Sequence, residues 1–406
     1  MFLINDPGPR NQIEIFCQLS DVGQYGGWGS SNGTFTWVCP SDVNDEVPMR
    51  VSVWGAGGCS GSYHSSGACH GGGGGGLAIS EFTPVAGQSY TVTVGHPGVT
   101  YNSRAGTSSF AGAGITTVSA YGGQGGDATG NPPGNPNATG ESSNPQNGDY
   151  GNGGIGVNGN VVNRRGGRGG TSNNNSSSGY GGGGASAPGP DGKRDGFRGG
   201  NGYTSYGSGS GGSIAYDGTY GDHYRAPGGA GTAGKGVFPH QSSSYYSYGG
   251  GGGAGLMGAG GRGANANSYS NDTRDQTEAG DGKGGALWLP NQIQLGGGGG
   301  GGGCAQHDGS QMASSCSGCG GPGAGGGAGP VYNSSNSNSY ICAGNGGVLG
   351  GGGGAPQYGI PGHGGIAGGG GGCGYDRYST TSYHYTEGAM GQGGPGMVVI
   401  QYAINV

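Results

Sequence analysis

The chain has 406 residues, of which 116 are glycine and only 9% are charged, with a formal net charge of −6. Ordinary globular proteins carry about 25% charged residues, so charge repulsion does not account for this composition. The weak net charge predicts no nucleic acid partner, and no apolar stretch approaches the ~20 residues of a membrane span. The first residues, Met1 to Asp6, lack the basic and apolar regions of a signal peptide, so we expect no conventional export.

The glycines gather in runs, the longest from Gly296 to Gly303, with others at 71–76, 181–184, 249–253, 350–354 and 368–372. Glycine loses more backbone freedom on folding than any other residue, so repeated runs predict a structure that needs them. Collagen is excluded because the glycines are contiguous and only 20 residues are proline. Polyglycine-II helices, with three residues per turn, can lie close together and pair their backbone groups between helices. The alternative is a set of flexible linkers.

Residues 1–33 predict an N-terminal attachment arm. Between Asn11 and Leu19 polar and apolar residues alternate, with Ile13, Ile15 and Cys17 on one face. This period of two is typical of a half-buried strand. The alternative for this segment is a frayed terminus.

Residues 34–125 predict a β-rich, glycine-rich domain closed by a C-terminal strand within 390–403. Strand-like stretches lie at 34–40, 49–54, 77–82, 89–95, 107–110 and 115–121. Short strands at this spacing, separated by turn residues, favour a small antiparallel β-sandwich. The sandwich frames residues 126–389, predicted as a packed polyglycine-II helix body with long Ser/Asn/Tyr-rich loops. The expected fold is therefore mostly β and irregular, with little or no α-helix.

Four inserts have a narrow composition, at 172–180, 241–248, 333–340 and 375–385. They are dominated by Ser, Asn and Tyr, and the chain holds 24 Tyr but only 7 Phe. Binding loops use this set of residues, because Tyr gives contact area at low entropic cost and Ser and Asn give adaptable hydrogen bonds. The candidate receptor-binding residues are Tyr245, Tyr246, Tyr248, Tyr340, Tyr375, Tyr378, Tyr383 and Tyr385. The alternatives are low-complexity disorder, or tyrosines that pack over neighbouring glycine helices.

The nine cysteines and the charged residues give no chemical site. Cys316 and Cys319 have C-x-x-C spacing, but a structural zinc site needs two such pairs, so disulfides or buried thiols are expected instead. Neither G-x-S-x-G nor H-E-x-x-H occurs, and no glycine run continues into Gly-Lys-Ser/Thr. We therefore expect no enzyme activity, no metal and no cofactor.

The order of motifs resembles a known family. Val53 to Gly58, a glycine run, Thr91 to Gly95, Thr107 to Phe110 and Gly396 to Tyr402 resemble, in that order, the glycine-rich domain of bacteriophage tail-fibre and receptor-binding proteins. Residues 122–375 resemble the T-even-type fibre-tip adhesins, whose polyglycine-II bodies carry variable loops at one end. The nine cysteines and the long inserts depart from that pattern.

The resemblance implies a virion protein of the tail or particle surface. Its partners would be a host cell-surface receptor, either protein or glycan, and other tail or fibre proteins, with homo-oligomers an open alternative. Two other functions compete with this one. The first is a purely structural virion or decoration protein. The second is an ice-binding polyglycine protein, which needs a flat regular face and is disfavoured by the irregular inserts.

Overall fold

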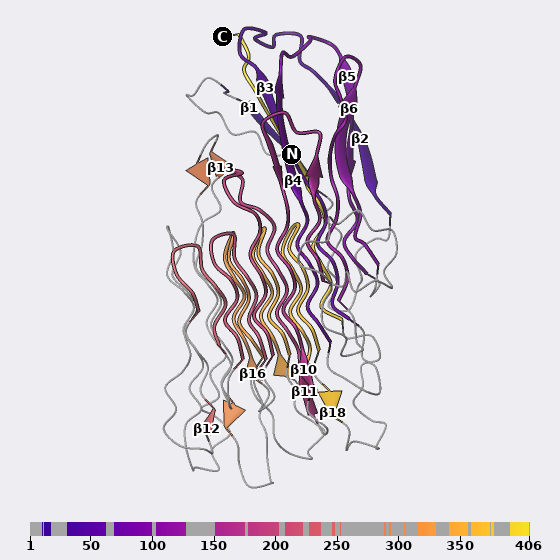
Figure 1. The fold of residues 1–406 in the computed structure, drawn as a ribbon. Helices are drawn as coiled ribbons and strands as arrows, with labels where there is room; N and C mark the ends of the chain where they lie inside the picture. The colour runs from indigo at the N-terminus through magenta and orange to yellow at the C-terminus, as the bar shows by residue number, and fades with distance from the viewer. Residues whose placement is uncertain are drawn as a thin grey trace.

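The structure is a computed structural model. It describes residues 10, 12–17, 31–61, 69–99, 103–126, 151–174, 178–202, 208–221, 227–236, 315–329, 341–355, 359–373, 375–376 and 390–405, with pieces at 246–247, 252, 288–289, 292–293 and 304–305. No helix of the α, 3₁₀ or π type occurs in these ranges, which confirms the mostly β and irregular fold. A β-sandwich forms one end of an elongated molecule, and glycine-rich segments run side by side away from it (Figure 1).

The sandwich consists of two antiparallel sheets of five strands each. The first sheet has the order β1 (Gln12–Cys17), β19 (Met397–Tyr402), β3 (Met49–Trp54), β4 (Leu77–Phe82) and β9 (Val162–Arg164). The second has the order β2 (Gly33–Val38), β5 (Ser89–Val94), β6 (Ser108–Gly112), β7 (Val118–Ala120) and β8 (Gly156–Val157). The predicted strands of 34–121 and of the C-terminus are therefore confirmed.

Two sheet strands come from the segment predicted as glycine body. β8 adds to β7, and β9 adds to β4 through pairs such as Ile79 with Val162. The sandwich and the glycine body thus interleave along the chain, because the chain returns to the sheets between its glycine segments.

Short strand pairs lie outside the sandwich. One small antiparallel sheet has the order β10 (Asn173–Asn174), β11 (Ser178–Tyr180) and β18 (Tyr375–Asp376). The other pairs are β12 (Tyr246–Ser247) with β15 (Cys304–Ala305), β13 (Trp288–Leu289) with β14 (Gln292–Ile293), and the parallel β16 (Ser315–Cys316) with β17 (Ile341–Cys342).

Two apolar clusters cover the two faces of the first sheet. Between the sheets, Trp37 and Tyr90 pack with Phe110, and alternate residues of β3 and β19 complete this core. On the outer face, Trp54, Leu77 and Met397 contact Ala187, Ile214, Leu349 and Ala367, which belong to the glycine body. The indole N–H of Trp54 donates to the Pro188 carbonyl at 3.0 Å. The sandwich and the body therefore share one apolar core.

The glycine body follows a period of three residues, which segment 71–76 shows directly. Gly71 and Gly74 donate their N–H groups to Gly170 and Gly167; Gly72 and Gly75 donate to Gly370 and Ala367; Gly73 and Gly76 donate to Gln124 and Tyr121. Each third residue therefore bonds the same neighbouring segment, as expected for polyglycine-II helices.

Segment 71–76 also accepts hydrogen bonds from three further segments. The donors are Gly55 and Gly58 from one segment, Gly154 from a second and Ala185 from a third. Together with the three acceptors this gives six neighbours around one helix. Segment 349–355 is surrounded in the same way, by segments 209–212, 181–187, 323–329, 344–347, 362–365 and 366–372. The flexible-linker alternative is therefore wrong for these runs.

Close packing explains why these positions are glycine. A Cβ atom added to Gly73 would overlap the carbonyl oxygen of Asn152, and one added to Gly353 would overlap that of Gly327. No side chain fits where one helix backbone touches the next. The longest run, 296–303, and most of 249–253 lie outside the described residues.

Candidate receptor-contact end of the glycine body

The body has two unlike ends. At the sandwich end the helices are joined by tight turns, in which hydrogen bonds close from Ala324 to Gly321, from Gly350 to Gly347 and from Gly368 to Gly365. Gly323, Leu349 and Ala367 in these turns have φ of 76°, 66° and 60°. A left-handed third residue is what a type II turn requires.

The inserts leave the body at its other end, far from the sandwich. β10, β11 and β18 lie at this end, below the glycine helices (Figure 1). The chain leaves the described body here after residues 61, 126, 202, 329, 355 and 373, and returns at 69, 151, 208, 341, 359 and 390.

Three of the long inserts join two helices that are already hydrogen-bonded neighbours. Gly151 donates to Gly125 across the insert 127–150, Gly344 donates to Gly327 across 330–340, and Gly394 donates to Gly368 across 374–389. The short connection 356–358 makes the same kind of link, since Gly362 donates to Gly353. The length of these three inserts is therefore not needed to connect the helices.

The structure places two of the eight candidate tyrosines by their backbone. Tyr375 lies in β18 opposite Gly179, and Tyr246 lies in β12 opposite Ala305. These two positions belong to separate small sheets. Tyr245, Tyr248, Tyr340, Tyr378, Tyr383 and Tyr385 lie outside the described residues, so their role stays a prediction.

The small sheet of β10, β11 and β18 joins two of the predicted inserts. It brings Tyr180 of the 172–180 tract opposite Asn173, one strand away from Tyr375. Our candidate set omits Tyr180, although it ends one of the four inserts that we singled out. The adjacency of inserts separated by about two hundred residues has no local signal in the sequence.

Buried groups secure the base of this end. The thiols of Cys69 and Cys373 are buried together, and the Cys69 N–H donates to the Cys373 carbonyl at 2.9 Å. His70 accepts the N–H of Ser172 on Nδ1 at 2.8 Å. The expected buried thiols are thus present, while Cys342 is in a disulfide.

On one face of the body, side chains accept backbone N–H groups of the neighbouring glycine-rich segments. These side chains form a ladder of hydrogen bonds. Asn345 Oδ1 accepts the N–H of His363 at 2.8 Å, and His363 Nδ1 accepts the N–H of Gln392 at 3.0 Å. Burial lowers the pKa of the His363 imidazole below its usual range. The face is therefore built from neutral acceptors.

Comparison with protein families identifies this architecture. The chain belongs to the glycine-rich domain family. The match covers residues 30–265, which include the sandwich strands from β2 to β9 and the first half of the glycine body. No curated protein matches the chain.

The glycine-rich domain shows no metal or membrane feature where it is described. Within those residues no three His, Cys, Asp or Glu side chains lie together as a metal site would need. The same residues include no helix that could span a membrane. The described part of this domain combines a closely packed glycine body with inserts connected at one of its ends.

Proposed function

We propose that this glycine-rich domain protein is a bacteriophage virion surface protein, a tail fibre or fibre-tip adhesin that binds a host cell-surface receptor. One observation carries the proposal: the Tyr/Ser/Asn-rich inserts are connected to the end of the glycine body that lies away from the sandwich. Loops held by a rigid scaffold commonly carry binding function. The receptor is a protein or glycan with groups that Tyr, Ser and Asn side chains recognise.

The glycine body suits this role because it fixes the bases of the inserts. Helices with six hydrogen-bonded neighbours leave little freedom for the residues at which each insert begins and ends. Fixing the ends in advance reduces the ordering cost of binding. Tyrosines at interface hot spots typically contribute about 2 kcal/mol or more, so two of them change affinity by roughly a thousandfold.

The sandwich is the expected attachment side for other tail or fibre proteins. β1 and β19 are neighbours in the first sheet, with Gln12 opposite Tyr402, so both terminal segments enter at the end away from the inserts. This arrangement leaves the inserts free to face a cell. Homo-oligomers of the chain fit the same arrangement.

The test replaces residues 374–389 with the short connection found at 356–358. Because the flanking helices are already bonded neighbours, we expect the variant to keep its melting temperature and to lose adsorption to host cells. Val161→Ala is the matched control, since this side chain is 46% exposed and lies at the sandwich end. Normal adsorption by variants shortened in this way at 330–340 and at 374–389 would support the purely structural alternative.

The eight candidate tyrosines allow a finer test by single replacement with alanine. A tyrosine that binds receptor loses host attachment with its melting temperature intact, whereas one that packs over the glycine helices loses both. If all eight variants attach normally, the inserts do not bind through these residues.

A further inference from the structure

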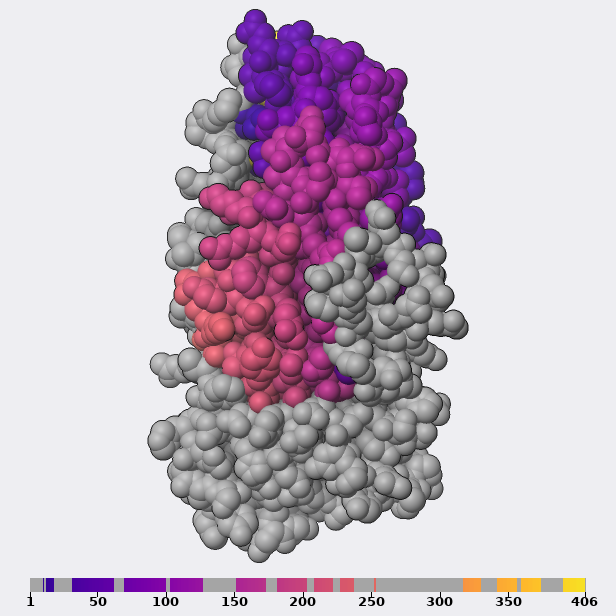
Figure 2. Space-filling model, in the orientation of Figure 1, coloured from indigo at the N-terminus to yellow at the C-terminus, as the bar shows by residue number. Residues whose placement is uncertain are grey.

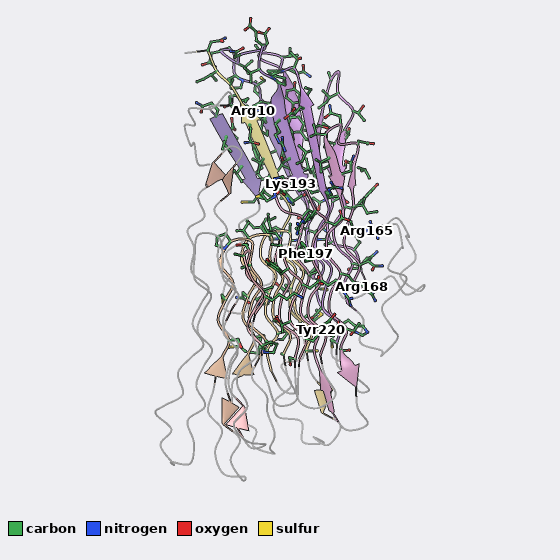
Figure 3. All side chains as sticks on the ribbon, turned by 60° about the vertical axis from the view of Figure 1, so that its left-hand side comes forward. Arg10, Arg165, Arg168, Lys193, Phe197 and Tyr220 are labelled. Carbon is green, nitrogen blue, oxygen red and sulfur yellow. The ribbon has the colours of Figure 1, made fainter. Side chains whose placement is uncertain are left out.

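Three parallel glycine-rich helices, 165–171, 196–202 and 218–221, form one side face of the body. Gly196 and Gly199 donate their N–H groups to Arg165 and Arg168 at 2.8 and 3.0 Å, and Gly218 donates to Arg198 at 2.7 Å. The described residues between 151 and 236, magenta to pink, form a coloured surface on this face (Figure 2). Arg165 and Arg168 project from the same edge of the body (Figure 3).

The outward side chains of the first two helices lie in register, because both have a period of three. Asp195 Oδ1 accepts the N–H of Arg165 at 3.0 Å, and Asn201 Oδ1 accepts the N–H of Thr171 at 3.0 Å. Arg168 lies three residues from both Arg165 and Thr171, and Arg198 lies three residues from both Asp195 and Asn201, so the shared register sets Arg198 beside Arg168. Positions 195 and 201 of the second helix carry hydrogen-bond acceptors, whereas position 198 between them carries a second cation.

One nitrogen of each guanidinium group lacks a hydrogen-bond partner in the described part of the chain. The Nε atoms of Arg168 and Arg198 are both buried without a hydrogen-bond partner. The ion pairs formed by described residues are Arg10–Glu81, Arg50–Glu81 and Lys193–Asp191. The nearby carboxylate of Asp217 accepts the backbone N–H of Arg198 at 2.9 Å.

This arrangement is costly without an anion. Burial, and then the positive charge of Arg198, lower the pKa of the Arg168 guanidinium to about 10. Two like charges held side by side repel, and buried donors without acceptors lose their hydration without compensation. A dianion between the groups removes both costs.

We propose that Arg168 and Arg198 bind a phosphate group on this side face. The planar guanidinium fork matches phosphate oxygens, and a phosphate monoester carries about −1.5 to −2 charges at pH 7, close to the charge of two arginines. The site goes beyond the proposed function, because it uses the side of the body and not the inserts. The phosphate comes either from free phosphate or from a phosphorylated polymer of the cell surface.

The test measures the melting temperature of the full chain with increasing inorganic phosphate, against sodium chloride at equal ionic strength. We expect a saturable rise with phosphate alone. Arg198→Asn is the decisive variant. The side-chain oxygen of Asn at position 198 can accept the backbone N–H of Arg168, as Asn201 Oδ1 accepts the backbone N–H of Thr171. The variant should melt no lower than the parent without phosphate, and its affinity for phosphate should fall at least about tenfold.

A control removes two positive charges from an exposed turn, one more than either single variant. Lys193→Ala with Arg194→Ala should keep the phosphate response. Arg168→Ala leaves the acceptors Asp195 and Asn201 in place and should lose the phosphate response. It serves as a second variant if Arg198→Asn folds poorly. Acetate, a monoanion, should bind more weakly than phosphate.

Two results would overturn the proposal. One is a parent chain that does not respond to phosphate, as when a carboxylate from outside the described residues already pairs with these arginines. The other is a response that survives loss of Arg168 and Arg198. The affinity for glycerol 3-phosphate, a phosphate monoester, identifies the source of the phosphate group. An affinity equal to that of inorganic phosphate indicates ester groups of a polymer. Weaker binding indicates free phosphate.

Discussion

Tyr402 donates its hydroxyl hydrogen to Oε1 of Glu14 at 2.9 Å, so the C-terminal strand is bonded to the first strand through two buried side chains. Glu14 is 7% exposed and Tyr402 is 4% exposed. Burial, and then the hydrogen bond to Glu14, raise the pKa of the Tyr402 hydroxyl, which keeps it protonated as a donor. This contact holds residues 12–17 in the first sheet.

We expect Tyr402→Phe to lower the free energy of unfolding by about 1–3 kcal/mol, because it leaves the buried Glu14 oxygen without its donor. Urea denaturation with two independent probes measures the loss. Glu14→Gln is the control, since its amide oxygen still accepts the Tyr402 hydrogen, and it should cost less. Equal stability of Tyr402→Phe and the parent would show that Glu14 finds another donor.

The same strand shows what sequence alone could and could not predict. The alternation of 11–19 correctly gave a strand with Ile13 and Ile15 on one face, and those residues contact the outer apolar cluster. A half-buried strand leaves its other face to solvent. Instead Glu14 is buried and Phe16 packs on the inner core, because β1 lies over the second sheet. An alternating pattern predicts that one face of a strand is apolar, but it does not predict which elements cover the other face.

The glycine body was predictable in kind, and a repeat in the sequence marks its turns. Residues 318–323, 344–349, 362–367 and 391–396 share the pattern Gly-x-Gly-Gly followed by two further residues. In the first three repeats, those two residues form the turn at the sandwich end. In the last three repeats, position x is occupied by Asn345, His363 and Gln392, which form the ladder on the outer face. This repeat is a local signal from which the turns can be predicted. The inserts, by contrast, are paired by the tertiary fold alone.

His363 makes the body sensitive to acid. Its Nδ1 accepts the N–H of Gln392, so the native state favours the neutral imidazole, and burial lowers its pKa below the usual value of about 6.5. The unfolded chain then binds a proton more readily than the native chain. Stability should be fully present above about pH 6.5 and fall as the pH drops below it.

The control for this prediction is His363→Asn, which keeps an acceptor of the kind that Asn345 supplies and removes the titration. Melting temperatures between pH 8 and pH 5 should decline less steeply for the variant than for the parent. Parallel curves for the two proteins would assign the acid sensitivity to other groups.

Leu349 combines a strained backbone with a buried side chain. It has φ of 66° in its turn and is 1% exposed within the cluster that joins the sandwich to the body. Leu349→Ala should lower the free energy of unfolding by about 2–4 kcal/mol, because it removes the buried side chain and keeps the strain. Leu349→Gly removes both, so it should be more stable than Leu349→Ala, opposite to the usual order of these residues. Chemical denaturation of the two variants decides the order.

Gly73 tests whether close backbone packing holds the body together. Its segment has six bonded neighbours, and a Cβ at Gly73 would overlap the Asn152 carbonyl oxygen. Relief requires a whole helix to move, because the obstructing atoms belong to the backbone and not to a flexible side chain. Overpacking in ordinary cores costs about 1–3 kcal/mol and occasionally more. We expect Gly73→Ala to cost more than about 3 kcal/mol or to prevent folding, as measured by urea denaturation and limited proteolysis.

Gly189→Ala is the matched control for that variant. A Cβ at Gly189 would meet Asp191 Oδ1 and Ile214 Cδ1 at 3.4 Å, which is ordinary van der Waals contact. Gly189 is buried, but the added methyl group displaces no atom, so this variant should lose far less stability than Gly73→Ala. The comparison separates two explanations for the glycine content. If glycine serves only to keep the chain flexible, the two variants lose equal stability; if it allows helices to touch, only Gly73→Ala is severely destabilised.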